Sequence, residues 1–168
     1  MKAFSCALLL AATLCGCAGY HIGEIKPQYL KGVHTIAIPT FKNGTYLPRI
    51  EVLVTNTVIK QFQQDGTFRI ANEENADAVL HCTIASVGRH PARSVRGNVL
   101  ATTEFNLALI VSYTLVGRDG KALTGPISVA GTTSFFVGAD VTTEEGQALP
   151  LAAEDMAVRL VSQLSEGW

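Results

Sequence analysis

Four basic residues in one short stretch are the side chains best suited to binding an anion. Arg89, His90, Arg93 and Arg96 lie within eight residues of each other, and no acidic residue follows them before Glu104. A planar guanidinium can donate two hydrogen bonds at once to a phosphate or a carboxylate. We predict an anion contact in this stretch. The alternative is an exposed basic loop without a ligand, or one that faces acidic residues of a partner.

A cysteine at the end of the N-terminal apolar run suggests a second, covalent chemistry. A short basic start and an apolar run precede Leu14-Cys15-Gly16-Cys17. This is the layout of a bacterial export signal, and the four residues resemble a lipobox, which is cut before its cysteine so that the thiol receives a diacylglyceryl group. We predict a cleaved signal peptide at 1–16 and a lipid anchor at Cys17, which carries diacylglycerol and an N-acyl chain.

The alternatives for this segment are a plain cleaved signal and a short membrane-spanning helix. The apolar run has about a dozen residues, fewer than the roughly 20 that span a bilayer. Two or more acyl chains hold a protein stably, since each buried methylene contributes roughly 0.8 kcal/mol. Ala18 follows Cys17, and the absence of aspartate there resembles lipoproteins sorted to the outer membrane. We expect an anchor in outer-membrane lipid, with the domain on the periplasmic side.

Motifs for metal binding, nucleophilic catalysis and phosphate binding are missing from the sequence. His81 and Cys82 are neighbours on a predicted strand, so they point to opposite faces, and the other histidines lack ligand spacing. We find no Gly-x-Ser-x-Gly and no glycine-rich phosphate loop. Neighbouring acids such as Glu154 and Asp155 suit a helix start better than an acid-base pair. We predict a protein that is not an enzyme, with no metal and no cofactor beyond the lipid on Cys17.

Composition and charge fit one exported domain. The 168-residue chain is 48% hydrophobic with a net charge of −1, so it can build a core and has no electrostatic footprint for nucleic acid. Cys6 and Cys15 leave with the signal and Cys17 is predicted to carry lipid, so Cys82 has no partner for a disulfide within the chain. We predict an irregular tether at 17–31 and a single α+β domain at 32–168.

Hydrophobic periodicity predicts two helices. Apolar residues recur every three or four positions from Ile50 to Phe62, with Gly66 as the C-terminal cap. The same spacing returns from Pro150 to Leu164. Alternating patterns predict the strands. The predicted strands are 34–38, 78–88, 105–115 and 127–137, with a short extended piece at 67–70 and loops at 40–48, 89–98 and 138–148.

This order predicts an α+β fold with an about four-stranded mixed or antiparallel sheet and two helices packed on one face. The other face of the longest strand carries Asn106, Ser112 and Thr114. A sheet with one packed and one polar face can meet water or a partner on its polar side.

The mature chain resembles one family over most of its length. The residues that carry the resemblance are Cys17-Ala18-Gly19-Tyr20-His21, the run from Ile36 to Pro48, the helix from Leu53 to Phe62 and the strand start Ala76 to Leu80. In this order they look like the LptE family of lipopolysaccharide-assembly lipoproteins. Pro39-Thr40-Phe41-Lys42-Asn43-Gly44-Thr45 is the most specific part, and Ala18 is an insertion into the usual Cys-Gly-Tyr-His start.

The resemblance implies a lipoprotein that sits partly inside a large outer-membrane β-barrel translocon, LptD-like in this family, and helps it to assemble. It also implies a contact with lipopolysaccharide, whose phosphates and carboxylates suit Arg89, Arg93 and Arg96. The runner-up is a periplasmic lipoprotein that regulates a cell-wall synthase or forms part of a secretion assembly. A periplasmic enzyme is the least supported interpretation.

Overall fold

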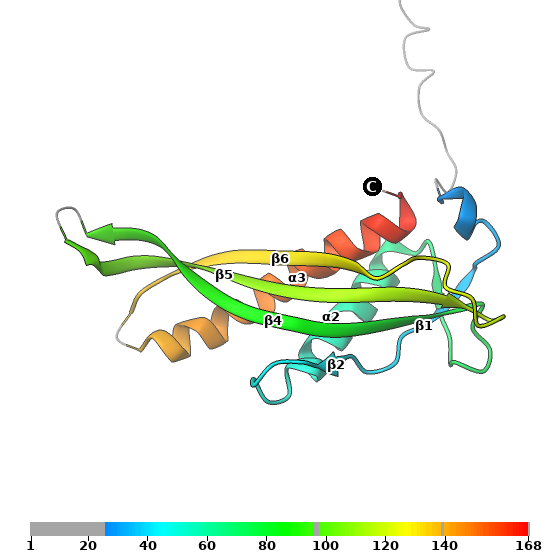
Figure 1. Cartoon of the computed structure of the whole chain (residues 1–168), viewed down its shortest axis with the longest axis horizontal. Helices are drawn as coiled ribbons and strands as arrows, with labels where there is room; N and C mark the ends of the chain where they lie inside the picture. Colours follow the sequence, from blue (N-terminus) through cyan, green and yellow to red (C-terminus); the bar gives the residue numbers. More distant parts are fainter. Residues whose placement is uncertain (1–25, 96–97, 139, 168) are drawn as a thin grey trace, which may run out of the picture.

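The computed structural model describes residues 26–95, 98–138 and 140–167. The predicted signal peptide (1–16), Cys17 and Arg96 lie outside the described residues. The described chain forms an elongated body (Figure 1). Its elements are η2 (Gln28–Leu30), β1 (Thr35–Ala37), β2 (Lys42–Asn43), α2 (Ile50–Asp65), β3 (Arg69–Ile70), β4 (Ala78–Val95), β5 (Asn98–Gly117), β6 (Ile127–Phe136) and α3 (Val141–Ser165).

The predicted α+β class with a mixed sheet is confirmed, but the predicted number of strands was too low. The sheet of the described residues has six strands in the order β3-β1-β4-β5-β6, and β2 also pairs with β4. β4, β5 and β6 form an antiparallel meander, whereas β1 and β2 join β4 in parallel. β2 was missed, and β3 was predicted only as a short extended piece at 67–70; each has two residues. Elements this short show no alternation that a sequence pattern could reveal.

Helix α2 follows the predicted pattern. Its inward side chains Ile50, Val54, Val58 and Phe62 are buried. Gly66 ends the helix at a φ of 75°, with its N–H donating to the Phe62 carbonyl. Because many of its residues are β-branched and form helices poorly, packing against the sheet must hold the helix together.

Helix α3 begins earlier than predicted. Asp140 caps its start by accepting a hydrogen bond from the Thr142 N–H, so residues 141–148 are helical rather than a loop. Pro150 lies inside the helix instead of in its first turn. Its missing N–H removes one hydrogen bond to the Gly146 carbonyl.

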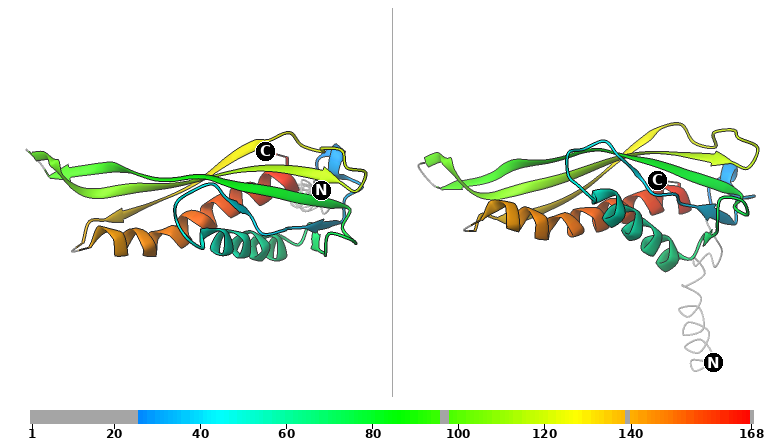
Figure 2. Two further views of the ribbon diagram at one scale, coloured as in Figure 1. Left: turned by 60° about the horizontal axis from the view of Figure 1, so that its bottom comes forward. Right: turned by 90° about the horizontal axis from the view of Figure 1, so that it is seen from below.

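The two helices pack side by side on one face of the sheet (Figure 2), as predicted. Between them and the sheet lies the core, to which β5 contributes every second side chain from Leu107 to Leu115. α3 approaches β6 so closely at Gly131 that a Cβ there would lie 2.1 Å from the Ala152 carbonyl oxygen. This backbone contact requires glycine.

Residues 26–31 belong to the segment predicted as a tether, and they are folded onto the domain. Leu30 is fully buried. The Lys26 ammonium donates to the Val33 carbonyl at 3.3 Å and lies 4.8 Å from the centroid of the Phe68 ring. Residues 26–31 are therefore packed against the domain.

Candidate functional site

The outer face of the sheet is left open by the described helices. Both helices lie on the opposite face (Figure 2), and no described helix covers this one. The register forms a cross-strand row of hydroxyls, Thr83, Ser112 and Ser128. Polar side chains on this face include His81, Thr83, Ser86, His90, Arg93, Glu104, Asn106, Ser112, Thr114, Ser128, Thr132 and Ser134. The register places the apolar Ala108, Ile110, Ala130 and Phe136 on the same face.

The far halves of β4 and β5 form a hairpin that projects beyond β6 (Figure 1). The sequence pattern predicted a loop at 89–98, and this prediction was wrong because β4 runs to Val95 and β5 starts at Asn98. The backbones of the two strands continue to pair beyond the last inward apolar side chains. This part of the hairpin therefore lacks the apolar–polar alternation from which strands are predicted. The predicted basic loop is thus the distal part of a β-hairpin.

Arg89 lies at the base of this hairpin and contacts α3. It is paired with Leu107, which is on the helix-covered face. Its guanidinium forms a hydrogen-bonded ion pair with Glu145 of α3. The guanidinium carbon also lies 5.5 Å from the centroid of the Phe105 ring. Arg89 therefore fastens the hairpin to the helix.

Arg93 lies on the opposite face from Arg89. It pairs in register with Glu104, and its Nε is 3.6 Å from the Glu104 carboxylate. Its side chain is 70% exposed, so the ion pair leaves the guanidinium accessible. The structure thus separates Arg89 from Arg93, and Arg96 lies outside the described residues. Sequence reasoning missed Glu145 because it lies 56 residues from Arg89.

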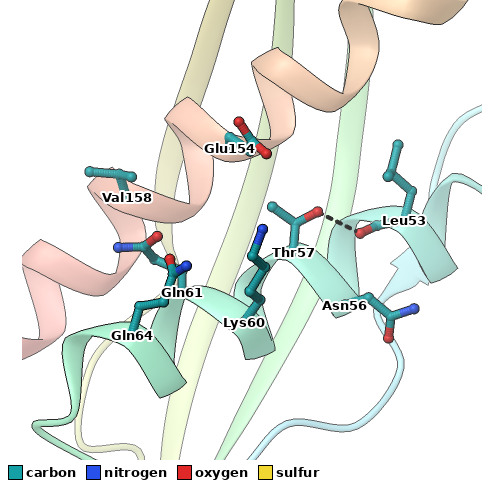
Figure 3. A pocket seen from close by; sticks show the side chains of 8 residues that line it. All are labelled: Leu53, Asn56, Thr57, Lys60, Gln61, Gln64, Glu154 and Val158. Carbon is teal, nitrogen blue, oxygen red and sulfur yellow. Dashed lines mark hydrogen bonds between the residues drawn. The ribbon is translucent and has the colours of Figure 1, made fainter.

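A groove of about 440 Å³ lies between α2 and α3 (Figure 3). The Thr57 hydroxyl donates to the Leu53 carbonyl at 2.9 Å, so it is used within its own helix. Most of the lining is polar and open, with no nucleophile held against a base. Its residues are Leu53, Asn56, Thr57, Lys60, Gln61, Gln64, Glu154 and Val158.

Across the described ranges, no three His, Cys, Asp or Glu side chains are grouped as metal ligands. None of the described helices is both long and apolar enough to cross a membrane. Cys82 is buried, as its place on a strand predicted, and burial raises the pKa of its thiol. A buried thiol of this kind is a core side chain rather than a nucleophile.

Asp77 joins the starts of β1 and β4. Its Oδ2 accepts hydrogen bonds from the His34 and Thr35 N–H groups, both at 3.0 Å, and from the Thr35 hydroxyl at 2.9 Å. These bonds, foremost the one from His34, lower the pKa of the Asp77 carboxyl below its usual value. These hydrogen bonds between β1 and the start of β4 are strongest while the Asp77 carboxylate is charged. They weaken as the pH falls through the lowered pKa of Asp77.

Comparison with known families gives one match. The model of a family described as LptE, lipopolysaccharide-assembly, matches residues 33–164. This range contains every described strand and nearly all of both helices. No protein with a curated description matches the chain in sequence.

Solved structures with this fold come from several bacteria. A minor lipoprotein of Acinetobacter baumannii has a TM-score of 0.54 at 18% identity, covering 80% of this chain and 92% of that one. Lipoprotein B of Nitrosomonas europaea has a TM-score of 0.54 at 13% identity, covering 88% of each chain. PelC of Paraburkholderia phytofirmans has a TM-score of 0.53 at 17% identity, covering 83% and 94%. At these identities the likeness concerns the fold alone.

Proposed function

Because this chain belongs to the lipopolysaccharide-assembly family LptE, we propose that it is an outer-membrane lipoprotein that docks in a β-barrel translocon. In this role it helps the barrel to assemble and to deliver lipopolysaccharide to the cell surface. It is anchored through Cys17 on the periplasmic side and catalyses no reaction. The family match supports the role in lipopolysaccharide assembly, whereas docking in a β-barrel is a proposal that goes beyond this match.

The observation that best supports docking is the bare outer face of the sheet. Its hydroxyl row of Thr83, Ser112 and Ser128 lies on β4, β5 and β6. Large outer-membrane barrels have a polar, water-filled lumen. A rigid sheet whose outer face offers hydrogen-bonding side chains suits such a lumen better than it suits lipid.

Co-purification tests the proposed partner. We expect an LptD-like barrel to be the main protein recovered with this lipoprotein from detergent-solubilised outer membranes, and depletion of the lipoprotein to reduce surface lipopolysaccharide. Recovery of a peptidoglycan synthase in place of the barrel would favour the runner-up. Unchanged surface lipopolysaccharide after depletion would contradict the transport role.

The lipopolysaccharide contact is proposed at the hairpin, through Arg93, Arg96 and Arg89. Arg93 supports this best, since its side chain is 70% exposed although Glu104 is beside it. Arg89 already has two neighbours in the chain, Glu145 and the Phe105 ring. Arg89 is therefore less free than Arg93 to donate hydrogen bonds to an added anion.

Arginine variants test this contact. We expect Arg93→Ala with Arg96→Ala to lower lipopolysaccharide binding several-fold, since each removes a guanidinium that can bond a phosphate twice. Arg89→Ala should have a smaller effect on binding and should mainly loosen the hairpin from α3. Binding to immobilised lipopolysaccharide measures both effects. If the triple alanine variant binds as the wild type does, the site is not at the hairpin.

A further inference from the structure

The loop between β2 and α2, here residues 43–49 and called the Asn43 loop, is held rigidly by its own side chains. The Asn43 amide group donates to the Leu47 carbonyl at 2.8 Å and to the Glu51 carboxylate at 3.0 Å. Its carbonyl oxygen accepts from the N–H and the hydroxyl of Thr45, at 2.9 and 2.8 Å. The Asn43 side chain therefore links the two ends of the loop to each other and to the first turn of α2.

Two backbone features also constrain this loop. The Gly44 N–H donates to the Ile84 carbonyl of β4 at 2.9 Å, and a Cβ on Gly44 would lie 2.7 Å from that oxygen. Arg49, the last residue of the loop, has a left-handed φ of 62°. A non-glycine residue in this conformation is uncommon and must be held by its surroundings.

This rigid loop presents apolar side chains to solvent. Tyr46 is fully exposed, and Leu47 is 36% exposed. Single exposed apolar residues need no explanation, but an aromatic side chain on a locked loop has little conformational entropy left to lose on binding. Tyrosine is also among the residues that dominate protein interfaces.

A groove of about 350 Å³ lies directly beside these side chains. It is lined by loop residues 44–47, which include Tyr46 and Leu47, by the β4 residues 85–87 and by Glu145 of α3. The β2 pairing ends at Ile84, and no other described strand pairs with that edge of β4 beyond this point. An unpaired strand edge can accept an extended segment as an added strand.

We propose that the Asn43 loop and the adjacent edge of β4 form a docking groove for an extended segment of the barrel partner, with Tyr46 as its anchor. This inference rests on the proposed function for the identity of the partner. The segment pairs its backbone with β4 beyond Ile84 and packs apolar side chains against Tyr46 and Leu47. A lipid surface is the less suitable occupant, because the groove runs along an unpaired edge of β4, and the N–H and C=O groups of that edge can be paired by an added strand but not by acyl chains.

In-cell photocrosslinking tests the groove. A benzophenone amino acid at position 46 should capture the barrel, identified by mass spectrometry, at least fivefold more than one at Tyr29. Tyr29 is a matched control because it is also an exposed tyrosine, 52% accessible, on η2. If the barrel co-purifies but position 46 does not capture it, the groove is not the docking site and the proposed function stands. If no barrel co-purifies, both proposals fail.

Substitutions separate the anchor from the locked loop. We expect Tyr46→Ser to reduce retention of the barrel by about tenfold and Tyr46→Phe to preserve it. Asn43→Ala keeps the tyrosine but unlocks the loop, so retention should fall to an intermediate value. Ala85→Arg places a large side chain in the groove and should therefore also reduce retention of the barrel. Circular dichroism must show the wild-type unfolding midpoint for each variant, and wild-type retention by Tyr46→Ser would overturn the proposal.

Discussion

Gly131→Ala is expected to destabilise the whole domain, by about 3 kcal/mol or more. A Cβ at this position would lie 2.1 Å from the Ala152 carbonyl oxygen and 2.4 Å from the Met156 nitrogen. Both atoms belong to the backbone of α3, so no side chain can rotate away to make room. The helix must move off β6 as a unit, which opens the core along its inner face.

Urea unfolding followed by circular dichroism measures this effect. Gly125→Ala is the matched control, because nothing lies within 4 Å of its Cβ position and its φ is not positive. It should change the free energy of unfolding by less than about 1 kcal/mol. Equal midpoints for the two variants would show that α3 does not rest on Gly131 in solution.

Asp155 explains why α3 sits so close to β6. Its carboxylate accepts the Thr132 N–H at 2.8 Å and the Arg159 guanidinium at 3.0 Å. Burial alone raises the pKa of Asp155, but these bonds outweigh it and the pKa is lowered. The hydrogen bond to the Thr132 N–H holds α3 against β6 one residue from Gly131, so it stabilises the close approach at that glycine.

The sequence predicts most accurately those elements in which buried apolar side chains recur at a regular spacing. α2 has a continuous inward stripe from Ile50 to Phe62 and a glycine at its end, and its bounds agree with the prediction. The inner face of β5 alternates without interruption from Leu107 to Leu115. Both patterns arise because each turn or each second residue must face the same core.

Elements extend further than predicted where they leave the core. The first turns of α3 are mostly polar and exposed, and Asp140 and its hydrogen bonds start the helix without an apolar stripe. The hairpin beyond Arg89 is held by backbone pairing, by the ion pair with Glu145 and by stacking of Phe105 on Phe135 at 5.8 Å. The ion pair and the aromatic stacking join residues that are far apart in the sequence, so no local pattern could reveal them.

The candidate surfaces were predictable in part. The polar positions Asn106, Ser112 and Thr114 were found from alternation alone, and the register places them on the outer face together with the apolar Ala108 and Ile110. The Asn43 loop, except for Arg49, lies within the loop predicted at 40–48. Its rigidity was not foreseeable, because it depends on Ile84 and Glu51, which lie outside the loop.

Cys17→Ala is expected to move the protein from the outer-membrane fraction to the soluble periplasm while its fold stays intact. Each buried methylene contributes roughly 0.8 kcal/mol, and two or more chains hold a protein stably. Loss of the proposed acylation site at Cys17 would remove all of that energy at once. Fractionation with immunoblotting measures the shift, and Cys15→Ala is the control, since it changes a cysteine two residues away and leaves Gly16-Cys17 in place.

Overproduction of the Cys17→Ala protein distinguishes positioning from any further role of the lipid. An anchor confines the domain to the membrane surface and so raises its effective concentration near the barrel. If this is its whole contribution, a soluble domain in excess should restore barrel assembly by mass action, because the sheet face and the Asn43 loop are unchanged. Failure of the excess protein to restore assembly would show that the acyl chains themselves take part in the complex. Full activity at normal levels would instead show that docking alone holds the domain in place.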